Sequence, residues 1–444
     1  MKRTATPPAS ASAEWTPARV GHCASQLFLY CFLAYTCSYI GRKNFSACLP
    51  AMIEEGMLTK TLGGYITTAY MLCYGAGQMI NGIIGSKVKP RFMIGTGLCG
   101  ATVCNLAMGL VPSAAVMPVV WALNGIFHSM LWAPIIRTFT DLLPNGRKEV
   151  AGTNIAASCS IGAVLAFLIP GFVLRFADWR VVFYVSGGIL LVAFLVWVFG
   201  NRYLGKYNRM MEEACRIERA AIRERAVTEA AADNRKVKRS LLGVMLASGL
   251  WVVLFGLLCN GALRDAVESW APVFLSDQFG LDSSAAAIIA VIIPLVSVTG
   301  TYFANWLFEK KLKNELTTAC VMFGIAAVCV GGLYLCRGVH ALLCSVFMAV
   351  AVSAMWGANH MFLTVVPYHF APLGMTSAVT GTLNSIIYFA TALCASLYGI
   401  LADKLGWNVM ILIWLGIGLF GAVLCLAGSG LWAKKRKLLD EGKI

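Results

Sequence analysis

Residues 35–50 read YTCSYIGRKNFSACLP, and residues 257–272 read LLCNGALRDAVESWAP. Each stretch lies in a long apolar segment and places an arginine eight residues before a proline: Arg42 before Pro50, and Arg264 before Pro272. A charge at membrane depth is costly in lipid, so it normally faces a protein interior or a water-filled cavity. The recurrence predicts a duplicated membrane protein in which each half contributes one cation to a shared central site.

The composition excludes an ordinary soluble protein. Of the 444 residues, 59% are hydrophobic and 13% are charged, whereas soluble globular proteins carry about 25% charged residues. We therefore expect a polytopic protein surrounded by membrane lipid. Residues 1–20 contain Glu14 and no early apolar run, so we expect no signal peptide. The basic residues are spread over separate loops, which argues against a nucleic-acid partner.

Twelve apolar runs are long enough to cross a bilayer, which takes about 20 residues. In the first half they lie at roughly 24–46, 62–85, 92–111, 115–140, 150–174 and 181–200. In the second half they lie at roughly 241–275, 283–308, 317–336, 341–368, 374–402 and 407–433. Lys and Arg gather in the terminal segments and in the loops on the same side, which predicts that both termini are cytoplasmic.

The predicted organisation has two six-helix halves and three polar segments. The parts are a tail over 1–23, a half over 24–200, a linker over 201–240, a half over 241–433 and a tail over 434–444. The Ala, Glu and Arg content of the linker favours a solvated helical spacer over a regulatory segment.

Another landmark repeats in both halves. Gly171 precedes Trp179 by eight residues, and Gly399 precedes Trp407 by eight. Repeated six-helix halves that flank a midplane site are the architecture of a secondary transporter that works by rocking. We therefore predict an all-α membrane protein with twelve transmembrane helices and a binding site between its halves.

Polar residues recur on single faces of four spans, where they line a cavity or hydrogen-bond neighbouring helices. They are Tyr35, Tyr39 and Arg42; Tyr70, Tyr74 and Gln78, with Asn81 close by; Asn260 and Arg264; and Asn384 and Tyr388.

Each of the two arginines could also have a role that does not involve a substrate. Arg42 and Lys43 could extend together to the membrane surface, and Arg264 could be neutralised by Asp265 or by Glu268. A guanidinium offers a planar fork suited to phosphate or carboxylate. Two forks from opposite halves could clamp one dianion, and this is the interpretation that we favour.

Little in the sequence supports catalysis or ATP use. No Gly-x-x-x-x-Gly-Lys-Ser/Thr loop occurs, and the sixteen cysteines include no Cys-x-x-Cys pair, so we expect no enzyme, cofactor or metal site. A proton relay has few candidates, namely Asp265, Glu268, His128 and His360. Exchange of one anion for another needs no relay and is favoured.

Short motifs along nearly the whole chain match a known family, namely Arg42-Lys43-Asn44-Phe45, Pro50, Glu54-Glu55-Gly56, Leu62-Gly63, Tyr74-Gly75, Pro90-Arg91, Trp132-Ala133-Pro134, Arg137-Thr138, Leu263-Arg264, Trp270, Pro272, Gly381 and Tyr388. In these residues the sequence resembles the organophosphate:phosphate antiporters of the major facilitator superfamily. The resemblance implies that the two arginines bind the substrate phosphate and that Tyr35, Tyr39 and Tyr388 line the same site. It also implies exchange of a phosphorylated metabolite for inorganic phosphate by rocking of the halves.

Several positions depart from the family pattern. Gln78 stands where many members have a lysine, which removes a positive charge and makes a carboxylate or phosphodiester substrate plausible. The other departures are Ser160-Ile161 near a family histidine, Pro294 and Ser269 at acidic positions, and Ser86 at a usual aspartate.

The sequence thus predicts a monomeric transporter in the inner membrane of a bacterium. We expect it to exchange an organophosphate for inorganic phosphate; the alternatives are a proton-coupled symporter of a sugar acid and a membrane receptor for a sugar phosphate. The expected substrate-binding residues are Arg42, Arg264, Tyr35, Tyr39, Tyr74, Gln78 and Tyr388, with Asp265 and Glu268 as charge partners.

Overall fold

The computed structural model describes residues 15–84, 88–144, 146–217, 241–370, 373 and 375–440. All the regular elements in these ranges are helices. Ten of the described helices are long and apolar enough to cross a membrane by length and composition. Ser86, most of the expected linker and both chain ends lie outside the described residues.

The first half contains the six expected spans in order. They are α1 (Pro17–Glu54), α2 (Lys60–Ile84), α3 (Pro90–Leu110), α4 (Met117–Ser129) with α5 (Trp132–Leu142), α6 (Lys148–Asn154) with α7 (Ala156–Val173), and α8 (Trp179–Tyr203).

The second half repeats this order with more interruptions. Its spans are α10 (Leu241–Ala247) with α11 (Trp251–Phe279), α12 (Ser283–Ala290) with α13 (Ile292–Leu307) and η2 (Phe308–Leu312), α14 (Glu315–Cys336), α15 (Ala341–His360) with η3 (Met361–Val365) and α16 (Val366–Tyr368), α17 (Thr376–Lys404), and α18 (Gly406–Asp440). The elements η2 and η3 are single π-helical turns.

The first helix is longer than the apolar run that predicted it. The Thr16 hydroxyl accepts the amide N–H of Arg19, and Pro17 occupies the first turn, where its missing N–H costs nothing. The helix continues through Pro50 to Glu54. The seventh span is instead split, because Gly249 takes φ +75° and ends the ladder between α10 and α11.

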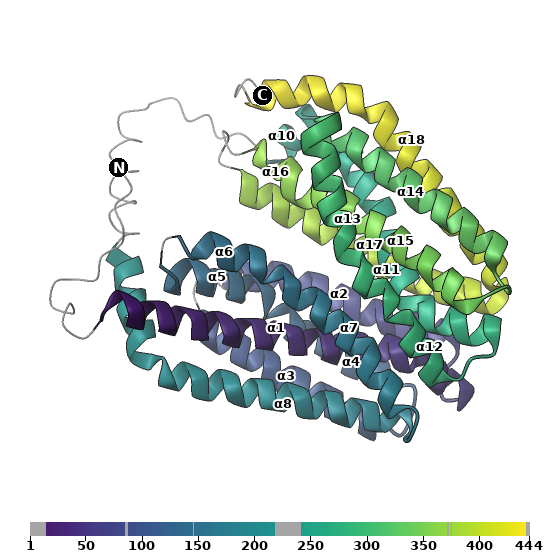
Figure 1. The fold of residues 1–444 in the computed structure, drawn as a ribbon, viewed down its shortest axis with the longest axis horizontal. Coiled ribbons are helices and arrows are strands. Elements are labelled where there is room, and N and C mark those ends of the chain that lie inside the picture. Colours follow the sequence, from purple (N-terminus) through teal and green to yellow (C-terminus); the bar gives the residue numbers. More distant parts are fainter. Residues whose placement is uncertain are drawn as a thin grey trace.

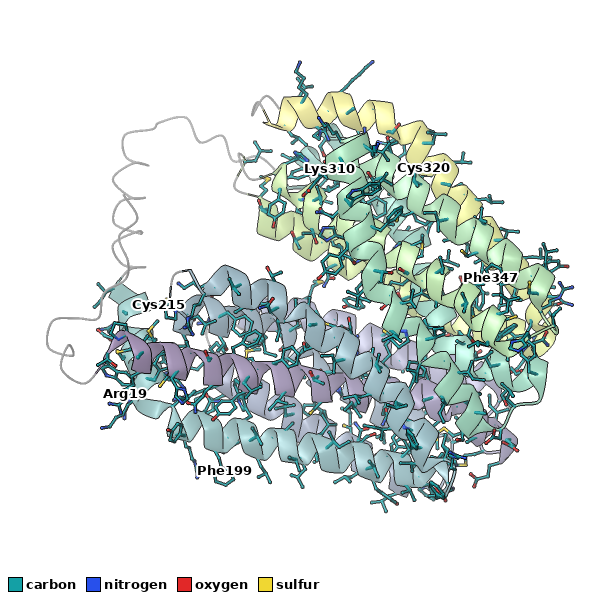
Figure 2. The ribbon with its side chains drawn as sticks, viewed as in Figure 1. Arg19, Phe199, Cys215, Lys310, Cys320 and Phe347 are labelled. Atoms are coloured by element: carbon teal, nitrogen blue, oxygen red, sulfur yellow. The ribbon has the colours of Figure 1, made fainter. Side chains whose placement is uncertain are left out.

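Apolar side chains cover much of the outside of the two bundles. Phe199 on α8 is 59% exposed and points away from its neighbours (Figure 2). So large an apolar surface needs lipid around it, and the chain is a multi-pass membrane protein.

The halves meet through small residues on α2, α7, α12 and α17. A Cβ atom on Gly399 would lie 2.5 Å from the carbonyl oxygen of Lys60, and one on Gly171 would lie 2.6 Å from the Ile288 side chain. Both glycines of the repeated Gly–Trp landmark therefore allow close approach between halves.

Polar contacts close one end of this interface. Lys60 Nζ lies 2.6 Å from Asp277 Oδ2, and the amide and hydroxyl of Thr61 donate to Asp403 Oδ2 at 2.6 and 2.5 Å. At the opposite end the two bundles diverge, and α5 and α6 lie apart from α16 (Figure 1). The start of α1 and the end of α18 are both on this diverging side (Figure 1).

Candidate functional site

Arg42 lies in the second half of α1, between its middle and Pro50, and is enclosed by aromatic rings. Its guanidinium carbon is 4.1 Å from the centre of the Tyr39 ring and 5.5 Å from that of Tyr74. In the part of the chain that the structure describes, no carboxylate or hydrogen-bond acceptor contacts Arg42. Aromatic faces attract a cation but do not neutralise it. The Arg42 guanidinium is therefore available to an anion.

The aromatic wall around Arg42 is built from both halves. The Tyr35 ring lies 5.5 Å from that of Tyr39, and the Tyr74 ring meets that of Tyr388 on α17 edge-on at 4.9 Å. Gln78 Nε2 donates to the Tyr74 hydroxyl at 2.8 Å. These five predicted residues thus form one connected group around Arg42.

Arg264 on α11 carries its own counter-charge. Its Nε and Nη2 donate to the two carboxylate oxygens of Asp265 at 3.1 and 2.9 Å, and its guanidinium carbon lies 4.6 Å from the Trp356 ring centre. Thr391 donates to the same carboxylate at 2.8 Å. Of the two partners considered from the sequence, Asp265 is the one that binds. Nη1 of Arg264 has no hydrogen bond within the described ranges.

Glu268 pairs with a residue that the sequence did not suggest. Lys43 Nζ lies 2.9 Å from Glu268 Oε2, and the two side chains are 10% and 5% exposed. The expectation that Lys43 could extend to the membrane surface is wrong, because its side chain turns inward to α11. A buried pair of this kind joins the halves, but much of its attraction is offset by desolvation.

The site has one more positive charge than negative. Among the described residues, Arg42, Lys43 and Arg264 lie with two carboxylates, Asp265 and Glu268. Lys43 follows Arg42 in α1 and pairs with Glu268 of α11, the helix that also carries the Arg264–Asp265 pair. The charges therefore form one connected group, with the surplus at Arg42.

Several residues of this group were not predicted as site residues. Lys43, Trp356 and Thr391 have no repeating pattern of their own. Trp132, whose ring lies 4.9 Å from that of Tyr35, was noticed only within the Trp-Ala-Pro motif. All four residues reach the site through contacts between helices that are distant in the sequence.

Other polar residues of the spans hold helices together. Asn81 donates to the Ser129 hydroxyl at 2.7 Å, and Asn260 donates to the carbonyl of Met355 at 2.7 Å. The two ring nitrogens of His128 lie 2.9 and 3.0 Å from the carbonyl oxygens of Asn124 and Ser38, not from a carboxylate. The packing interpretation therefore fits Asn81, Asn260 and His128. The described residues contain no cluster of three or more potential metal ligands.

Comparisons with known proteins identify the family of this chain. The family model described as Major Facilitator Superfamily matches residues 31–393. The phosphoglycerate transporter protein of Salmonella typhimurium is 22% identical, with 89% of this chain and 86% of that protein covered. The glycerol-3-phosphate transporter of Bacillus subtilis is 22% identical, with 86% and 87% covered.

A solved structure supports the fold. A bacterial homologue of the human lysosomal transporter Spinster, in an inward-facing and unoccupied conformation, superposes with a TM-score of 0.67 at 14% identity, covering 95% of this chain and 97% of that chain. The family model spans most of the chain, from within α1 to within α17. The chain therefore belongs to the Major Facilitator Superfamily and is a transporter, not an enzyme.

Proposed function

We propose that this transporter exchanges a phosphorylated metabolite for inorganic phosphate, with the anion held between Arg42 and Arg264. The observation that carries this proposal is the free guanidinium of Arg42 inside its wall of tyrosines. Arginine matches the geometry of phosphate, because its planar fork donates two parallel hydrogen bonds. Similarity to transporters of phosphoglycerate and glycerol 3-phosphate supports the same substrate class.

The mechanism follows from the charges. Without an anion, the positive charge of Arg42 is unbalanced, whereas that of Arg264 is offset by Asp265. A bound phosphate group contacts Arg42 and the free Nη1 of Arg264, and so draws the diverging ends of the halves together. Lys60 and Asp277 must then separate for the opposite side to open. Inorganic phosphate returns the transporter by the same movement.

The orientation belongs to this proposal as well. The basic loops place both termini in the cytoplasm, so the diverging side in Figure 1 faces the cytoplasm. We infer two mobile halves, residues 24–200 and 241–433, joined by a linker over 201–240, in a monomer in a bacterial inner membrane.

A second candidate is a proton-coupled symporter of a sugar acid. It is favoured by the single surplus charge, because Gln78 is neutral and a monoanion would suffice to balance Arg42. In that case Asp265 would accept the coupled proton when substrate displaces it from Arg264.

Proteoliposomes distinguish the candidates. Vesicles loaded with inorganic phosphate are given labelled glycerol 3-phosphate, phosphoglycerate, hexose 6-phosphate or a sugar acid. We expect rapid uptake of a phosphate ester only when phosphate is inside. Sugar-acid uptake that follows an imposed pH gradient, without dependence on internal phosphate, would replace this proposal with the symporter. Tight binding without counterflow would indicate a receptor.

A further inference from the structure

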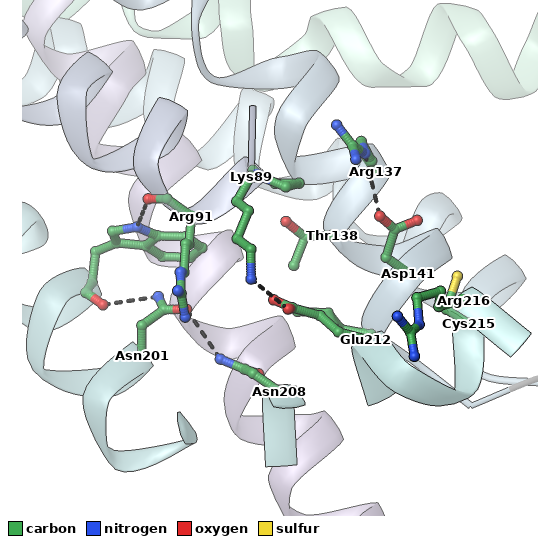
Figure 3. Close-up of a pocket in the computed structure, with 13 residues that line it drawn as sticks. Lys89, Arg91, Arg137, Thr138, Asp141, Asn201, Asn208, Glu212, Cys215 and Arg216 are labelled. Carbon is green, nitrogen blue, oxygen red and sulfur yellow. Dashed lines mark hydrogen bonds and ion pairs between the residues drawn. The ribbon is translucent and has the colours of Figure 1, made fainter. Parts of the chain in front are cut away.

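A separate cavity lies at the diverging end of the first half, away from Arg42. It has a volume of about 260 Å³ and is bounded by α3, α5, α8 and the helical segment over residues 205–217 (Figure 3). Its charged lining residues are Lys89, Arg91, Arg137, Asp141, Glu212 and Arg216. The lining therefore holds four cations and two carboxylates.

Three of these cations have carboxylate partners. Lys89 pairs with Glu212 at 2.8 Å, Arg137 with Asp141 at 3.2 Å, and Arg216 with Glu213 at 2.7 Å.

Arg91 differs from these three. Within the described part of the chain it has no carboxylate partner, and its Nε is buried without a hydrogen bond. A buried donor in that condition costs about 1–3 kcal/mol. Asn208, which is 1% exposed, also lines the cavity, and its Oδ1 accepts no hydrogen bond. One donor and one acceptor are thus unused beside the cavity, although both atoms are closed to water and lie behind its open surface.

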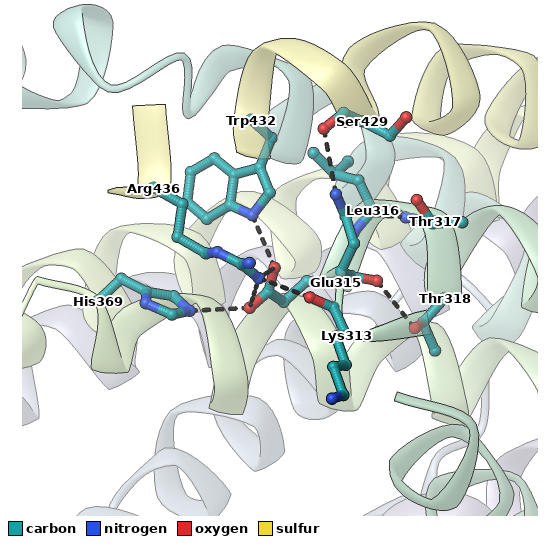
Figure 4. Close-up of polar contacts among 10 residues, drawn as sticks. Lys313, Glu315, Leu316, Thr317, Thr318, His369, Ser429, Trp432 and Arg436 are labelled. Carbon is teal, nitrogen blue, oxygen red and sulfur yellow. Dashed lines mark hydrogen bonds and ion pairs between the residues drawn. The ribbon is translucent and has the colours of Figure 1, made fainter. Parts of the chain in front are cut away.

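In the second half, a buried carboxylate lies at the start of the third span. Glu315, at the start of α14, has a side chain that is 0% exposed and accepts hydrogen bonds from three groups (Figure 4). They are His369 Nε2 at 2.8 Å, Trp432 Nε1 at 2.9 Å and Arg436 Nη1 at 2.9 Å. One buried anion thereby holds the third, fourth and sixth spans of this half together.

The first half uses the equivalent spans, but the two carboxylates among its described lining residues are already paired with Lys89 and Arg137, and neither is at the start of α3. Arg91 lies at the start of α3, as Glu315 does in α14. A tryptophan of the sixth span reaches the start of the third span in each half, but Trp197 Nε1 donates to the backbone carbonyl of Arg91 at 3.0 Å, whereas Trp432 Nε1 donates to the Glu315 carboxylate. Arg91 therefore adds a cation at the place where the other half has its buried anion.

We propose that this cavity binds a phosphate group, either the headgroup phosphate of an anionic lipid or free phosphate from solution. The phosphate occupies the place that the Glu315 carboxylate takes in the second half. The Arg91 guanidinium turns into the cavity to donate to it, and Lys89 and Arg216, which line the same cavity, add attraction. The bound group would tie α3 to α8, as Glu315 ties α14 to α18.

Thermal unfolding of the purified full chain in neutral detergent tests this site. One arm titrates phosphatidylglycerol into the micelles of the unaltered protein. The other titrates inorganic phosphate into the protein carrying Arg42→Gln and Arg264→Gln, so that the central site does not contribute. Stabilisation in the first arm identifies a lipid, and stabilisation in the second identifies free phosphate.

Substitutions locate the effect. Arg91→Gln should weaken the apparent affinity about tenfold, because a charge-assisted hydrogen bond is lost. Arg202→Gln, which removes an exposed arginine of α8 outside the cavity lining, should leave the affinity unchanged. Arg91→Glu supplies the missing carboxylate, so it should abolish binding while keeping the protein folded, even where Arg91→Gln does not fold. Equal affinities in the Arg91 and Arg202 variants, or no stabilisation by either probe, would overturn the proposal.

Discussion

The closing ends of the two halves carry equivalent carboxylates with different cation partners. Glu55 and Asp277 each follow the arginine of their half by thirteen residues. Each accepts an indole N–H from the start of the sixth span of its half, Glu55 from Trp179 and Asp277 from Trp407. The duplication has therefore preserved the carboxylate and its indole.

The residue that follows this tryptophan differs between the halves, and the carboxylate therefore has a different cation partner in each half. In the first half it is Arg180, whose Nη1 lies 3.0 Å from Glu55 Oε1. In the second half it is Asn408, which is neutral, and Asp277 instead binds Lys60 of the first half at 2.6 Å. A single missing cation thus turns a contact within one half into a latch between halves.

The largest expected effect comes from breaking the buried inter-half pair Lys43–Glu268. Removing one partner leaves the other charge buried and alone, which typically costs about 3–5 kcal/mol. We expect Glu268→Gln to lower the free energy of unfolding by about this amount, measured by denaturant titration in detergent. The double variant Lys43→Met with Glu268→Leu should recover most of the loss. Equal destabilisation by the single and double variants would contradict this role.

The repeated arginines provide the next test. Arg42→Lys and Arg264→Lys keep the charge but lose the fork, so we expect uptake to fall about 100-fold while expression persists. We expect Arg42→Lys to reduce uptake more than Arg264→Lys, because the guanidinium of Arg264 already donates two hydrogen bonds to Asp265. Arg202→Lys serves as the control. Near-normal counterflow by either site variant would rule out the clamp.

The repeated glycines should differ as well. A methyl group on Gly399 would meet the backbone of Lys60, which cannot move aside, whereas one on Gly171 would first meet the Ile288 side chain. We expect Gly399→Ala to cost about 1–3 kcal/mol and Gly171→Ala less, as measured by thermal unfolding. Gly416→Ala is the control, since nothing lies within 4 Å of its added methyl. A greater loss from Gly171→Ala than from Gly399→Ala would contradict this ranking.

The order of the spans could be predicted because each is an apolar run of sufficient length. The ends were less predictable: α1 runs on through Pro50 into Glu54, where hydropathy no longer marks a helix. The split before α11 depends on the left-handed backbone of Gly249, which composition does not reveal. Spacing along one helix likewise placed Tyr35, Tyr39 and Arg42 on a single face.

Partners across helices could not be predicted in the same way. Adjacent residues on a helix do not normally face each other, so nothing in the sequence favoured Asp265 over Glu268 as the partner of Arg264. Glu268 instead pairs with Lys43, which lies on another helix more than 200 positions away in the sequence. Periodicity describes faces of helices, and only packing decides which faces meet.

The smallest expected effect concerns the latch itself. Asn408→Arg gives Asp277 a cation from its own half, as Arg180 gives Glu55, and should draw it away from Lys60. The side chains of Lys60 and Asp277 are 19% and 28% exposed, so losing their pairing should favour opening by about 1 kcal/mol or less. Amide hydrogen exchange at the start of α2 and of α12 should then accelerate up to about fivefold.

Combining substitutions tests whether Asn408→Arg acts through the Lys60–Asp277 pair or by disturbing the structure elsewhere. Lys60→Gln should accelerate exchange at the same amides, and the two substitutions together should do no more than either alone, since both remove one ion pair. Asn408→Gln adds no charge and should leave exchange as it was. Additive acceleration in the double variant would mean that Asn408→Arg acts elsewhere. Non-additivity would show that the identity of the residue after Trp407 decides whether Asp277 pairs within its own half or with Lys60 of the other half.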